Sequence, residues 1–201
     1  MDTVDWRSTG PAISPTARLT FWPLRVAHAD EMAEVLGDRR LYGFIGGEPD
    51  GTDQLRARYE RMTAGSPRPA EVWLNWVVRL EDEGCLVGTV QATVVDGTAE
   101  VAWLIGVPWQ GRGIAREAAR ALVDRLAEGP VTTLIAHIHP EHHASAAVAR
   151  AAGLAPTDRR GPLGAAARHL TPRGLIRRRR RRDPPRTARS RCGRAGPRAD
   201  G

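Results

Sequence analysis

Lysine is absent from this chain of 201 residues, and all 30 of its Lys and Arg positions are therefore arginine. A phosphate loop of the Walker type needs a lysine that reaches the phosphates, so the chain has no such loop. An enzyme that holds its substrate through a Schiff base needs a lysine amine as well. The absence of this one residue type excludes both classes of protein.

Cysteine and long apolar runs are scarce. The two cysteines, Cys85 and Cys192, lie far apart and form no C-x-x-C or zinc-type spacing, which favours a reducing compartment without a disulfide framework. No apolar run approaches the roughly 18 residues that a membrane span needs. The first residues also lack the basic-then-apolar pattern of a secretory signal. These absences predict a cytoplasmic protein without a membrane segment.

The net charge of +7 is divided unevenly along the chain. Up to Asp158 there are 15 arginines against 21 acidic residues, a charge of −6, and from Arg159 onward there are 15 arginines against 2 aspartates, a charge of +13. The acidic body favours a cationic partner. Nucleic acid could be bound only through the basic tail, for example through Arg177–Arg182.

The composition changes at the same point. Arg, Ala, Gly and Pro supply 32 of the 43 residues from 159 to 201, and no aromatic residue occurs there. Such a segment has little apolar surface to offset the entropy of ordering, so we expect it to be disordered. These four residues also have codons built wholly from G and C, so a slipped reading frame is an alternative origin. We therefore expect a flexible leader (1–15), one domain (16–158) and a tail (159–201).

Hydrophobic periodicity predicts, in chain order, a strand, two helices, three strands, a helix, a strand and a helix. Asp96-Gly97 is a strong hairpin signal within the run of three strands, which makes that run an antiparallel meander. The later helix connects two strands that would pair in parallel. The fold class is therefore mixed α/β. The predicted bounds are 18–24, 29–37, 54–63, 73–80, 86–95, 99–105, 114–126, 131–138 and 144–152.

The segment Val107–Glu117, VPWQGRGIARE, follows a predicted strand and opens a helix. A helix start with a glycine-rich entry binds anions, because its free N–H groups and the helix dipole both favour negative charge. A pyrophosphate would fit this pattern. The dinucleotide pattern G-x-G-x-x-G fails because Arg116 stands in the last glycine's place. A tight strand-to-helix turn without a ligand remains the alternative.

Gln110, Gly113 and Ala115 occupy the matching places of Q/R-x-x-G-x-G/A, the signature of the GNAT N-acetyltransferases. The order of elements around the motif and the segment His139–Leu154 also resemble that family, in its RimL-like branch, over roughly residues 16–156. The resemblance implies a GNAT fold that uses acetyl-CoA to acetylate a primary amine. Two alternatives stay open: a non-catalytic acyl-CoA-binding module, and a nucleic-acid-associated protein that acts through its tail.

The resemblance also implies roles for individual residues. Backbone groups of Ile105 and Val107 would pair with the pantetheine arm, and the N–H groups from Gly111 to Ala115 would hold the pyrophosphate. His142 stands where relatives have an asparagine. The implied cofactor-binding residues are Ile105, Val107, Gln110, Gly111, Arg112, Gly113, Ile114, Ala115 and His142.

Glu100 and Ser145 are the catalytic candidates. Glu100 matches a strand glutamate that acts as general base in some relatives, and a protonated amine needs such a base near neutral pH. Ser145 matches a serine that protonates the leaving thiolate. The alternatives are a solvated strand carboxylate for Glu100 and a helix N-cap for Ser145.

Three further expectations concern the metal, the acceptor and the end of the sheet. The histidines 137, 139, 142 and 143 lack a clear fourth ligand of the zinc type, so no metal is expected.

Family resemblance implies an amine site around the first two helices. The acceptor would be cationic, such as a protein N-terminus, an aminoglycoside or a polyamine, and the aromatics that could line its site are Tyr42, Phe44, Trp73 and Trp76. Nothing from 159 onward alternates like a strand, so the family's closing hairpin is expected to be missing.

Overall fold

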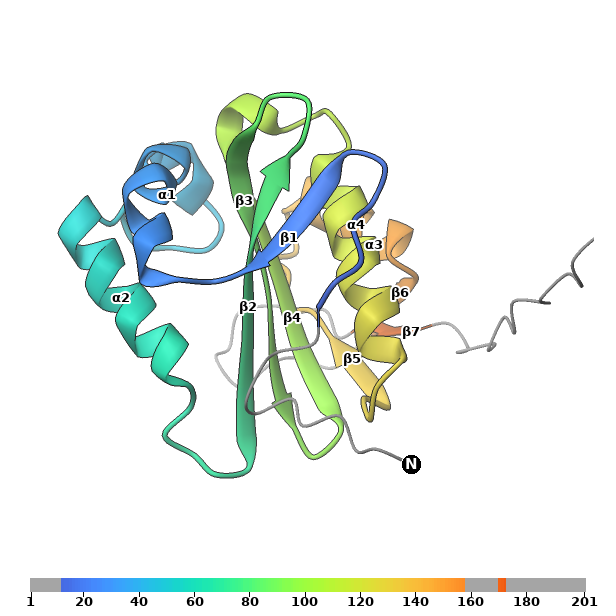
Figure 1. The fold of residues 1–201 in the computed structure, drawn as a ribbon. Helices are drawn as coiled ribbons and strands as arrows, with labels where there is room; N and C mark the ends of the chain where they lie inside the picture. The colour runs from blue at the N-terminus through green and yellow to red at the C-terminus, as the bar shows by residue number, and fades with distance from the viewer. Residues whose placement is uncertain (1–11, 158–169, 173–201) are drawn as a thin grey trace, which may run out of the picture.

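The computed structural model describes residues 12–157 and 170–172. Its centre is a five-stranded sheet in the order β1-β2-β3-β4-β5 (Figure 1). The first four strands pair antiparallel and β5 pairs parallel to β4, as the meander and crossover pattern predicts. The strands are β1 (Leu19–Pro23), β2 (Glu71–Leu80), β3 (Cys85–Val95), β4 (Thr98–Ile105) and β5 (Thr133–Ile135).

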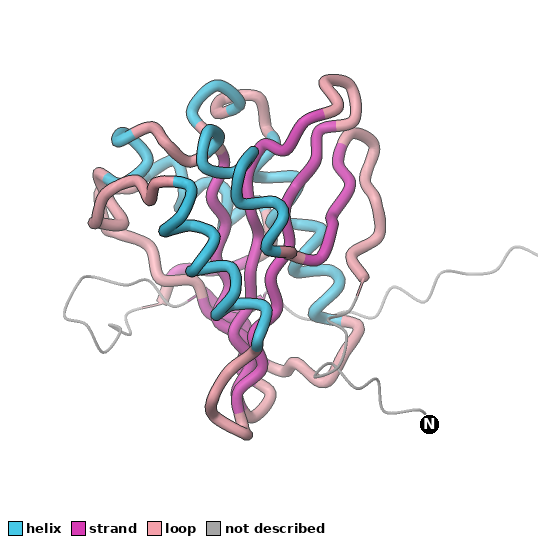
Figure 2. Tube along the Cα trace, turned by 60° about the vertical axis from the view of Figure 1, so that its left-hand side comes forward, coloured by secondary structure: helices cyan, strands magenta, loops and turns pink. Residues whose placement is uncertain are grey.

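Helices cover both faces of the sheet (Figures 1 and 2). α1 (Ala29–Val35) and α2 (Thr52–Ala64) lie on one side, and α3 (Ile114–Ala127) and α4 (His143–Ala151) lie on the other. Three short 3-10 helices, η1 (Val26–His28), η2 (Arg39–Tyr42) and η3 (Val107–Trp109), join these elements. The mixed α/β class predicted from the sequence is therefore confirmed.

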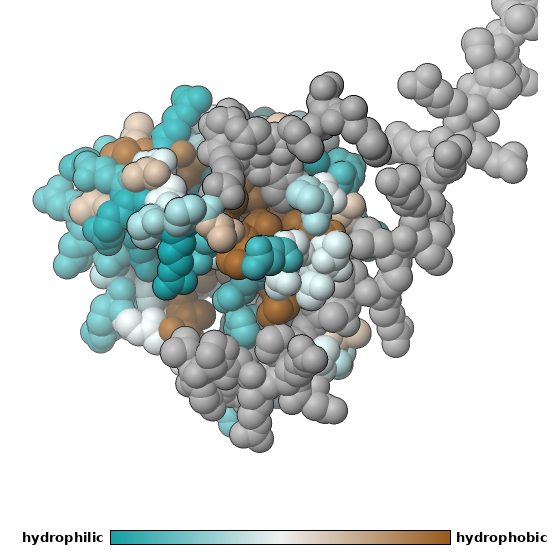
Figure 3. All heavy atoms as spheres, turned by 90° about the horizontal axis from the view of Figure 1, so that it is seen from below, coloured by the Kyte–Doolittle hydropathy of each residue, from teal (hydrophilic) through white to brown (hydrophobic). Residues whose placement is uncertain are grey.

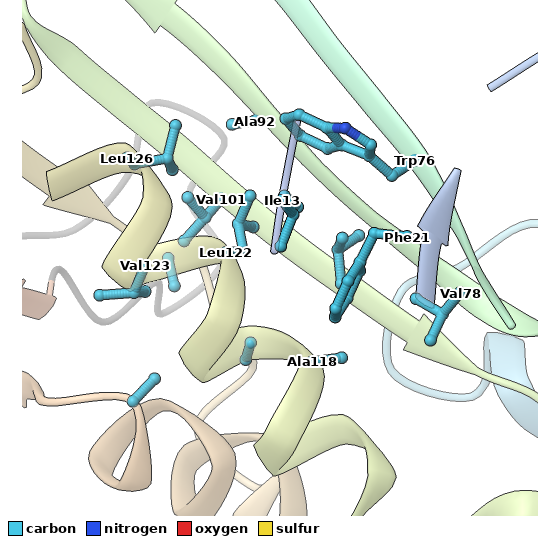
Figure 4. Close-up of a cluster of buried hydrophobic side chains, with 14 of the residues drawn as sticks. Ile13, Phe21, Trp76, Val78, Ala92, Val101, Ala118, Leu122, Val123 and Leu126 are labelled. Carbon is cyan, nitrogen blue, oxygen red and sulfur yellow. The ribbon is translucent and has the colours of Figure 1, made fainter. Parts of the chain in front are cut away.

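The strand β2 contributes to two hydrophobic cores. Leu74, Trp76 and Val78 pack on the α3 side in one cluster with Leu122. Figure 4 shows Trp76 and Val78 of this strand in that cluster. Val77 points the other way and is fully buried, because α1 and α2 cover that face. Burying an apolar side chain of this size contributes about 1.5–3 kcal/mol. Alternation along β2 thus stabilises both layers of helices, and it assigns Trp76 to the core.

The helices keep their polar side chains outward. Seen from below, the surface that carries α2 presents mainly hydrophilic residues, and hydrophobic ones show near the centre of this face (Figure 3). Within residues 12–157 and 170–172, no helix has the length and apolar character needed to cross a bilayer.

The ladder between β4 and β5 is short. It joins Thr98–Glu100 to Thr133–Ile135 and then stops, whereas β4 continues to Ile105. The predicted strand 131–138 is therefore too long, because residues 136–138 diverge from β4 instead of pairing with it. This divergence opens the sheet beside the start of α3.

Two expectations about the ends of the domain need correction. Ile13 is buried in the α3-side core, so residues 12–15 belong to the domain and not to the predicted leader. The strand β6 (Leu154–Pro156) pairs antiparallel with β7 (Leu170–Pro172), and β7 also lies beside β5. The expectation of no strand after Arg159 is thus wrong for these three residues, which pair through backbone groups without an alternating pattern. The rest of the predicted tail lies outside the described residues.

Candidate functional site

A hollow of about 350 Å³ lies where β4 ends and α3 begins, and we call it the cradle hollow. Its walls come from three elements: the end of β4, the glycine-rich turn with the first turn of α3, and the first turns of α4. The lining residues are Trp103, Leu104, Ile105, Trp109, Gln110, Gly111, Gly113, Ile114, Ala115, Arg116, His142, Ala144, Ser145, Ala147 and Val148.

The glycine-rich turn presents free backbone N–H groups to this hollow. Gly111 and Gly113 have φ angles of 73° and 79°, a left-handed conformation that glycine adopts without strain. The N–H groups from Gly111 to Arg116 donate to no carbonyl or side chain of a described residue, and the first helical bond here is from Glu117 N–H to the Gly113 carbonyl. Free donors at the start of a 14-residue helix make an anion site.

The two arginines of the motif behave differently. Arg116 lines the cradle hollow and forms no ion pair with a described residue. The Arg112 side chain instead pairs with Glu83, with 2.7 Å between Nη2 and Oε1, and it lines none of the hollows described here. Arg116 is therefore the charged side chain that the cradle hollow offers to an anion, whereas the sequence prediction names Arg112 and not Arg116 as cofactor-binding.

A partly buried ionic contact holds the glycine-rich turn in place from behind. Arg18 donates through Nε and Nη2 to Oε2 of Glu117, at 2.8 and 2.6 Å, and through Nη1 to the Arg112 carbonyl. The Thr16 hydroxyl also donates to Glu117. Burial by itself would raise the pKa of Glu117, but the hydrogen bonds from Thr16 and Arg18 outweigh it and lower that pKa. The first strand is thus fastened to the first turn of α3.

Glu117→Gln should lower the free energy of unfolding at pH 7 by about 1–2 kcal/mol, because hydrogen bonds to a charged group are lost. The pKa of Glu117 is lower in the folded state, so its contribution is present above the unfolded-state pKa of about 4.3 and is lost as the pH falls through the folded value. Urea unfolding at pH 7 and at pH 3 should show the difference shrinking on acidification. Glu128→Gln, on an exposed carboxylate of the same helix region, is the control and should change little. A difference that does not shrink would contradict this role.

A second hollow of about 670 Å³ fills the divergence between β4 and residues 136–138, and we call it the splay hollow. It shares Trp103, Leu104, Gln110 and Ser145 with the cradle hollow. β4 has no described strand partner on this side beyond Glu100. An extended group that enters from the cradle would therefore lie along a free strand edge.

His142 lies at the boundary between the cradle hollow and the splay hollow and lines both. It is the N-cap of α4, and its Nδ1 accepts the Ser145 N–H at 3.4 Å. Its ring stacks on Phe44 with 4.4 Å between centroids. Burial, and then the nearby His139, lower the pKa of His142, so the ring is neutral at pH 7 and can accept that bond. The alternative that Ser145 is itself the N-cap is wrong, since His142 has that role.

Ser145 lines both hollows from the first turn of α4. Its hydroxyl makes no hydrogen bond to the side chains or backbone of residues that the structure describes. A hydroxyl in this position is available to a group bound across the two hollows, as the predicted acid role requires.

Glu100 lies on β4 just before the divergence and is half exposed, with 58% of its side chain accessible. Its Oε2 is 3.5 Å from Nε2 of His137, and His137 lines the splay hollow, whereas Glu100 lines none of the hollows. The sequence pattern suggests a role for His137 only as a possible metal ligand. The parallel register, which places Glu100 opposite Ile135, is what brings the two side chains together.

Ile105 and Val107, the two residues predicted to pair with the pantetheine arm, have different surroundings in the structure. The Gln110 side chain donates to the Ile105 carbonyl at 3.0 Å, so that carbonyl already accepts one hydrogen bond. Val107 lies in η3 and packs against the α1–α2 core, and it lines none of the hollows. Ile105 thus remains at the cradle, while Val107 is turned from it.

The predicted aromatics are distributed among different roles. Phe44 lies in the splay hollow between His139 and His142. The Tyr42 hydroxyl donates to the Leu36 carbonyl, and Trp73 donates to Glu71. Across the described ranges, no three His, Cys, Asp or Glu side chains are grouped to hold a metal ion.

A third hollow, of about 290 Å³, lies between α2 and the sheet, and we call it the α2 hollow. It shares Trp103 and Leu104 with the other two and Ile45 and Ala102 with the splay hollow. The three hollows therefore meet at the end of β4. A sheet that opens beside the free N–H groups of a helix start, with two further hollows meeting it there, is an arrangement that can hold a phosphate-bearing ligand next to a second ligand.

The family model described as the acetyltransferase (GNAT) domain matches residues 18–155, so the chain belongs to the GNAT acetyltransferase family. The resemblance seen in the sequence is thereby confirmed. No curated protein matches the chain by sequence.

Solved structures with the same fold include acetyltransferases that act on different amines. RimL, the ribosomal L7/L12 α-N-protein acetyltransferase in complex with coenzyme A, has a TM-score of 0.66 at 15% identity, covering 79% of this chain and 93% of its own. Spermidine N-acetyltransferase from Vibrio cholerae with CoA and spermine has 0.60 at 17%, covering 78% and 94%. The aminoglycoside acetyltransferase AAC(6')-Ib with coenzyme A and kanamycin has 0.64 at 17%, covering 77% and 95%. At these identities the likeness establishes the fold.

Proposed function

We propose that this protein transfers the acetyl group of acetyl-CoA to a primary amine. The observation that carries the proposal is the cradle hollow, which is lined by Arg116 and by Gly111, Gly113, Ile114 and Ala115, all with free backbone N–H groups. This site connects to a free strand edge in the splay hollow. Family membership and the CoA-bound relatives support the same ligand.

The residues present fit the parts of acetyl-CoA. The N–H groups of the glycine turn and Arg116 would hold the pyrophosphate, because donors and positive charge favour it there. The β4 edge from Val101 to Ile105 would hold the pantetheine arm. Gln110, which lines both hollows, already fastens the Ile105 carbonyl and so fixes the direction of this edge. Bound acetyl-CoA would supply the acetyl thioester.

The reaction needs a base that removes a proton from the amine and an acid that donates a proton to the leaving thiolate. The amine nitrogen attacks the thioester carbonyl carbon, forming a C–N bond while the C–S bond breaks. The Glu100–His137 pair would take the amine proton, directly or through water. The Ser145 hydroxyl would give a proton to the departing thiolate and regain one from the attacking nitrogen, which loses its second proton as the amide forms. Positioning of the two reactants between the three hollows would supply much of the acceleration.

Turnover with a panel of primary amines tests this function. The full chain is incubated with acetyl-CoA and monoamines, polyamines, an aminoglycoside or short peptides, while free thiol and acetylated amine are measured. We expect amine-dependent release of CoA in equal amount to the acetylated product. Acetyl-CoA should also raise the melting temperature, since a ligand at 100 times its Kd stabilises by about 2.7 kcal/mol. A raised melting temperature without acetylation of any amine would overturn the enzyme in favour of an acyl-CoA-binding module.

A further inference from the structure

The first turn of α4 depends on a histidine cap. Nδ1 of His142 accepts the Ser145 N–H at 3.4 Å, and the His142 carbonyl accepts the Ala146 N–H. The first N–H groups of a helix have no partner within it, so a side chain that accepts one of them stabilises the helix start. A histidine nitrogen can accept only while it carries no proton. An asparagine side chain would accept through an amide oxygen that does not titrate, so the histidine gives this cap a dependence on pH.

The capping bond acts directly on Ser145. This residue lies in the first turn of α4 and lines both the cradle hollow and the splay hollow. A helical backbone leaves a side chain few rotamers, so a bond that fixes the Ser145 N–H also limits the directions in which its hydroxyl can point. Loss of the bond leaves this N–H without a partner and loosens the turn. The state of His142 therefore decides whether the Ser145 hydroxyl stays directed at the two hollows.

Phe44 holds the His142 ring in the orientation that caps the helix. The two rings stack with 4.4 Å between centroids and 20° between planes. Phe44 comes from the segment between η2 and α2, so the stack connects that segment to the start of α4. It also covers one face of the His142 ring. Burial is the main cause that lowers the pKa of His142, and it favours the neutral ring that can accept a hydrogen bond.

The charges around His142 also disfavour a proton on its ring. His139 further lowers the pKa of His142. Glu141 is exposed, so water and salt screen its charge, and Arg40 pairs with Asp38. The dipole of α4 makes a cation at the helix start unfavourable as well. The titratable or charged side chains that line either hollow together with His142 are Arg40, Arg116, His137, His139, Glu141 and His143.

We propose that His142 is the positioning residue for Ser145, and that its neutral ring, held by Phe44, keeps the Ser145 hydroxyl directed at the bound thioester. The inference rests on the proposed acetyl transfer. A protonated ring carries a hydrogen on Nδ1 and cannot accept the Ser145 N–H. The pKa of His142 in the fold lies below the ordinary 6.5, so the cap is present above that folded value and is lost as the pH falls through it. Acidification should therefore slow the transfer through the loss of this cap.

The pH profile of kcat separates this role from a merely structural one. The full chain, His142→Asn and His142→Ala are compared with saturating acetyl-CoA and the best amine of the panel, each normalised to its own rate at pH 8. Between pH 8 and pH 5 the wild type should lose at least about threefold more of its rate than His142→Asn, whose cap does not titrate. Ionisation of the amine and of the Glu100–His137 pair is common to both and cancels in the comparison. At pH 8, His142→Ala should be about fivefold slower than His142→Asn, because alanine cannot cap.

His28→Asn is the matched control. Nδ1 of His28 also accepts a backbone N–H, from Arg25 at 3.1 Å, and its ring stacks on Trp22. His28 lines none of the three hollows, so this variant should keep the normalised profile of the wild type. Phe44→Ala should make the loss of rate begin at a higher pH, because the His142 ring is then less buried.

An NMR titration gives a measurement that does not depend on turnover. In isotope-labelled protein, the Ser145 amide should shift with the same midpoint as the His142 ring, and this shift should be absent in His142→Asn. A Ser145 amide that does not follow the ring would overturn the proposal, as would equal normalised profiles of the wild type and His142→Asn. Acetylation of no amine would overturn the acetyl transfer, and the amide titration would still decide whether His142 holds Ser145.

Discussion

Gly113→Val should abolish the stabilisation by acetyl-CoA and weaken its binding by more than 100-fold. Gly113 is the N-cap of α3 with a φ of 79°, a conformation that a β-branched residue adopts only with strain. An added Cβ would also lie 3.6 Å from Nη2 of Arg18, whose side chain holds the glycine-rich turn in place. Thermal denaturation with and without acetyl-CoA, and calorimetric titration, measure the two effects.

The control for Gly113→Val is a substitution at another glycine with a positive φ, placed away from the cradle hollow. Gly153 has a φ of 88°, and an added Cβ would have nothing within 4 Å. It follows the far end of α4, so Gly153→Val should lower the melting temperature of the free protein and keep the response to acetyl-CoA. If Gly113→Val responds to acetyl-CoA as the wild type does, the cradle is wrongly assigned.

Glu100→Gln should lower kcat at pH 7 by about 10²–10⁴-fold, the usual contribution of a general base. Binding of acetyl-CoA should be unchanged, because Glu100 lines none of the hollows. Raising the pH should restore part of the rate, since more of the amine is then already deprotonated. The pH profile of kcat in wild type and variant is the measurement.

The pairing with His137 gives this prediction a second part. His137→Gln should reduce kcat similarly, and the double variant should be little slower than either single one, because residues that act as a unit are not additive. Ser145→Ala should also lower kcat, but without rescue at high pH, since it acts on the thiolate. Glu60→Gln, on the exposed surface of α2, should have no effect. If Glu100→Gln and Ser145→Ala both turn over like the wild type, the assigned base and acid are wrong.

Local signals in the sequence determined the elements and their order. The Asp96-Gly97 turn has φ angles of 46° and 75°, as the hairpin signal predicts, and it fixes the β3–β4 pairing. The glycines before Ile114 place a left-handed turn at the start of α3. Each of these features depends on neighbours a few residues away, so a single chain read in order is sufficient to predict them.

Contacts between distant segments were decided only by the tertiary structure. The short β4–β5 ladder brings His137 to Glu100. Glu83 pairs with Arg112 away from the cradle hollow, whereas Arg116 lines that hollow. The β6–β7 pair forms in a segment without an alternating pattern, because backbone groups alone make its hydrogen bonds.

The α2 hollow belongs to the same class of features. Tyr59 has the helical spacing of a core residue, and the pattern gives no sign that its hydroxyl lacks a partner. That fact depends on how α2 sits over strands that follow it in the chain. Sequence determined which residues face inward, whereas packing across the sheet decided which of their polar groups find a hydrogen-bond partner.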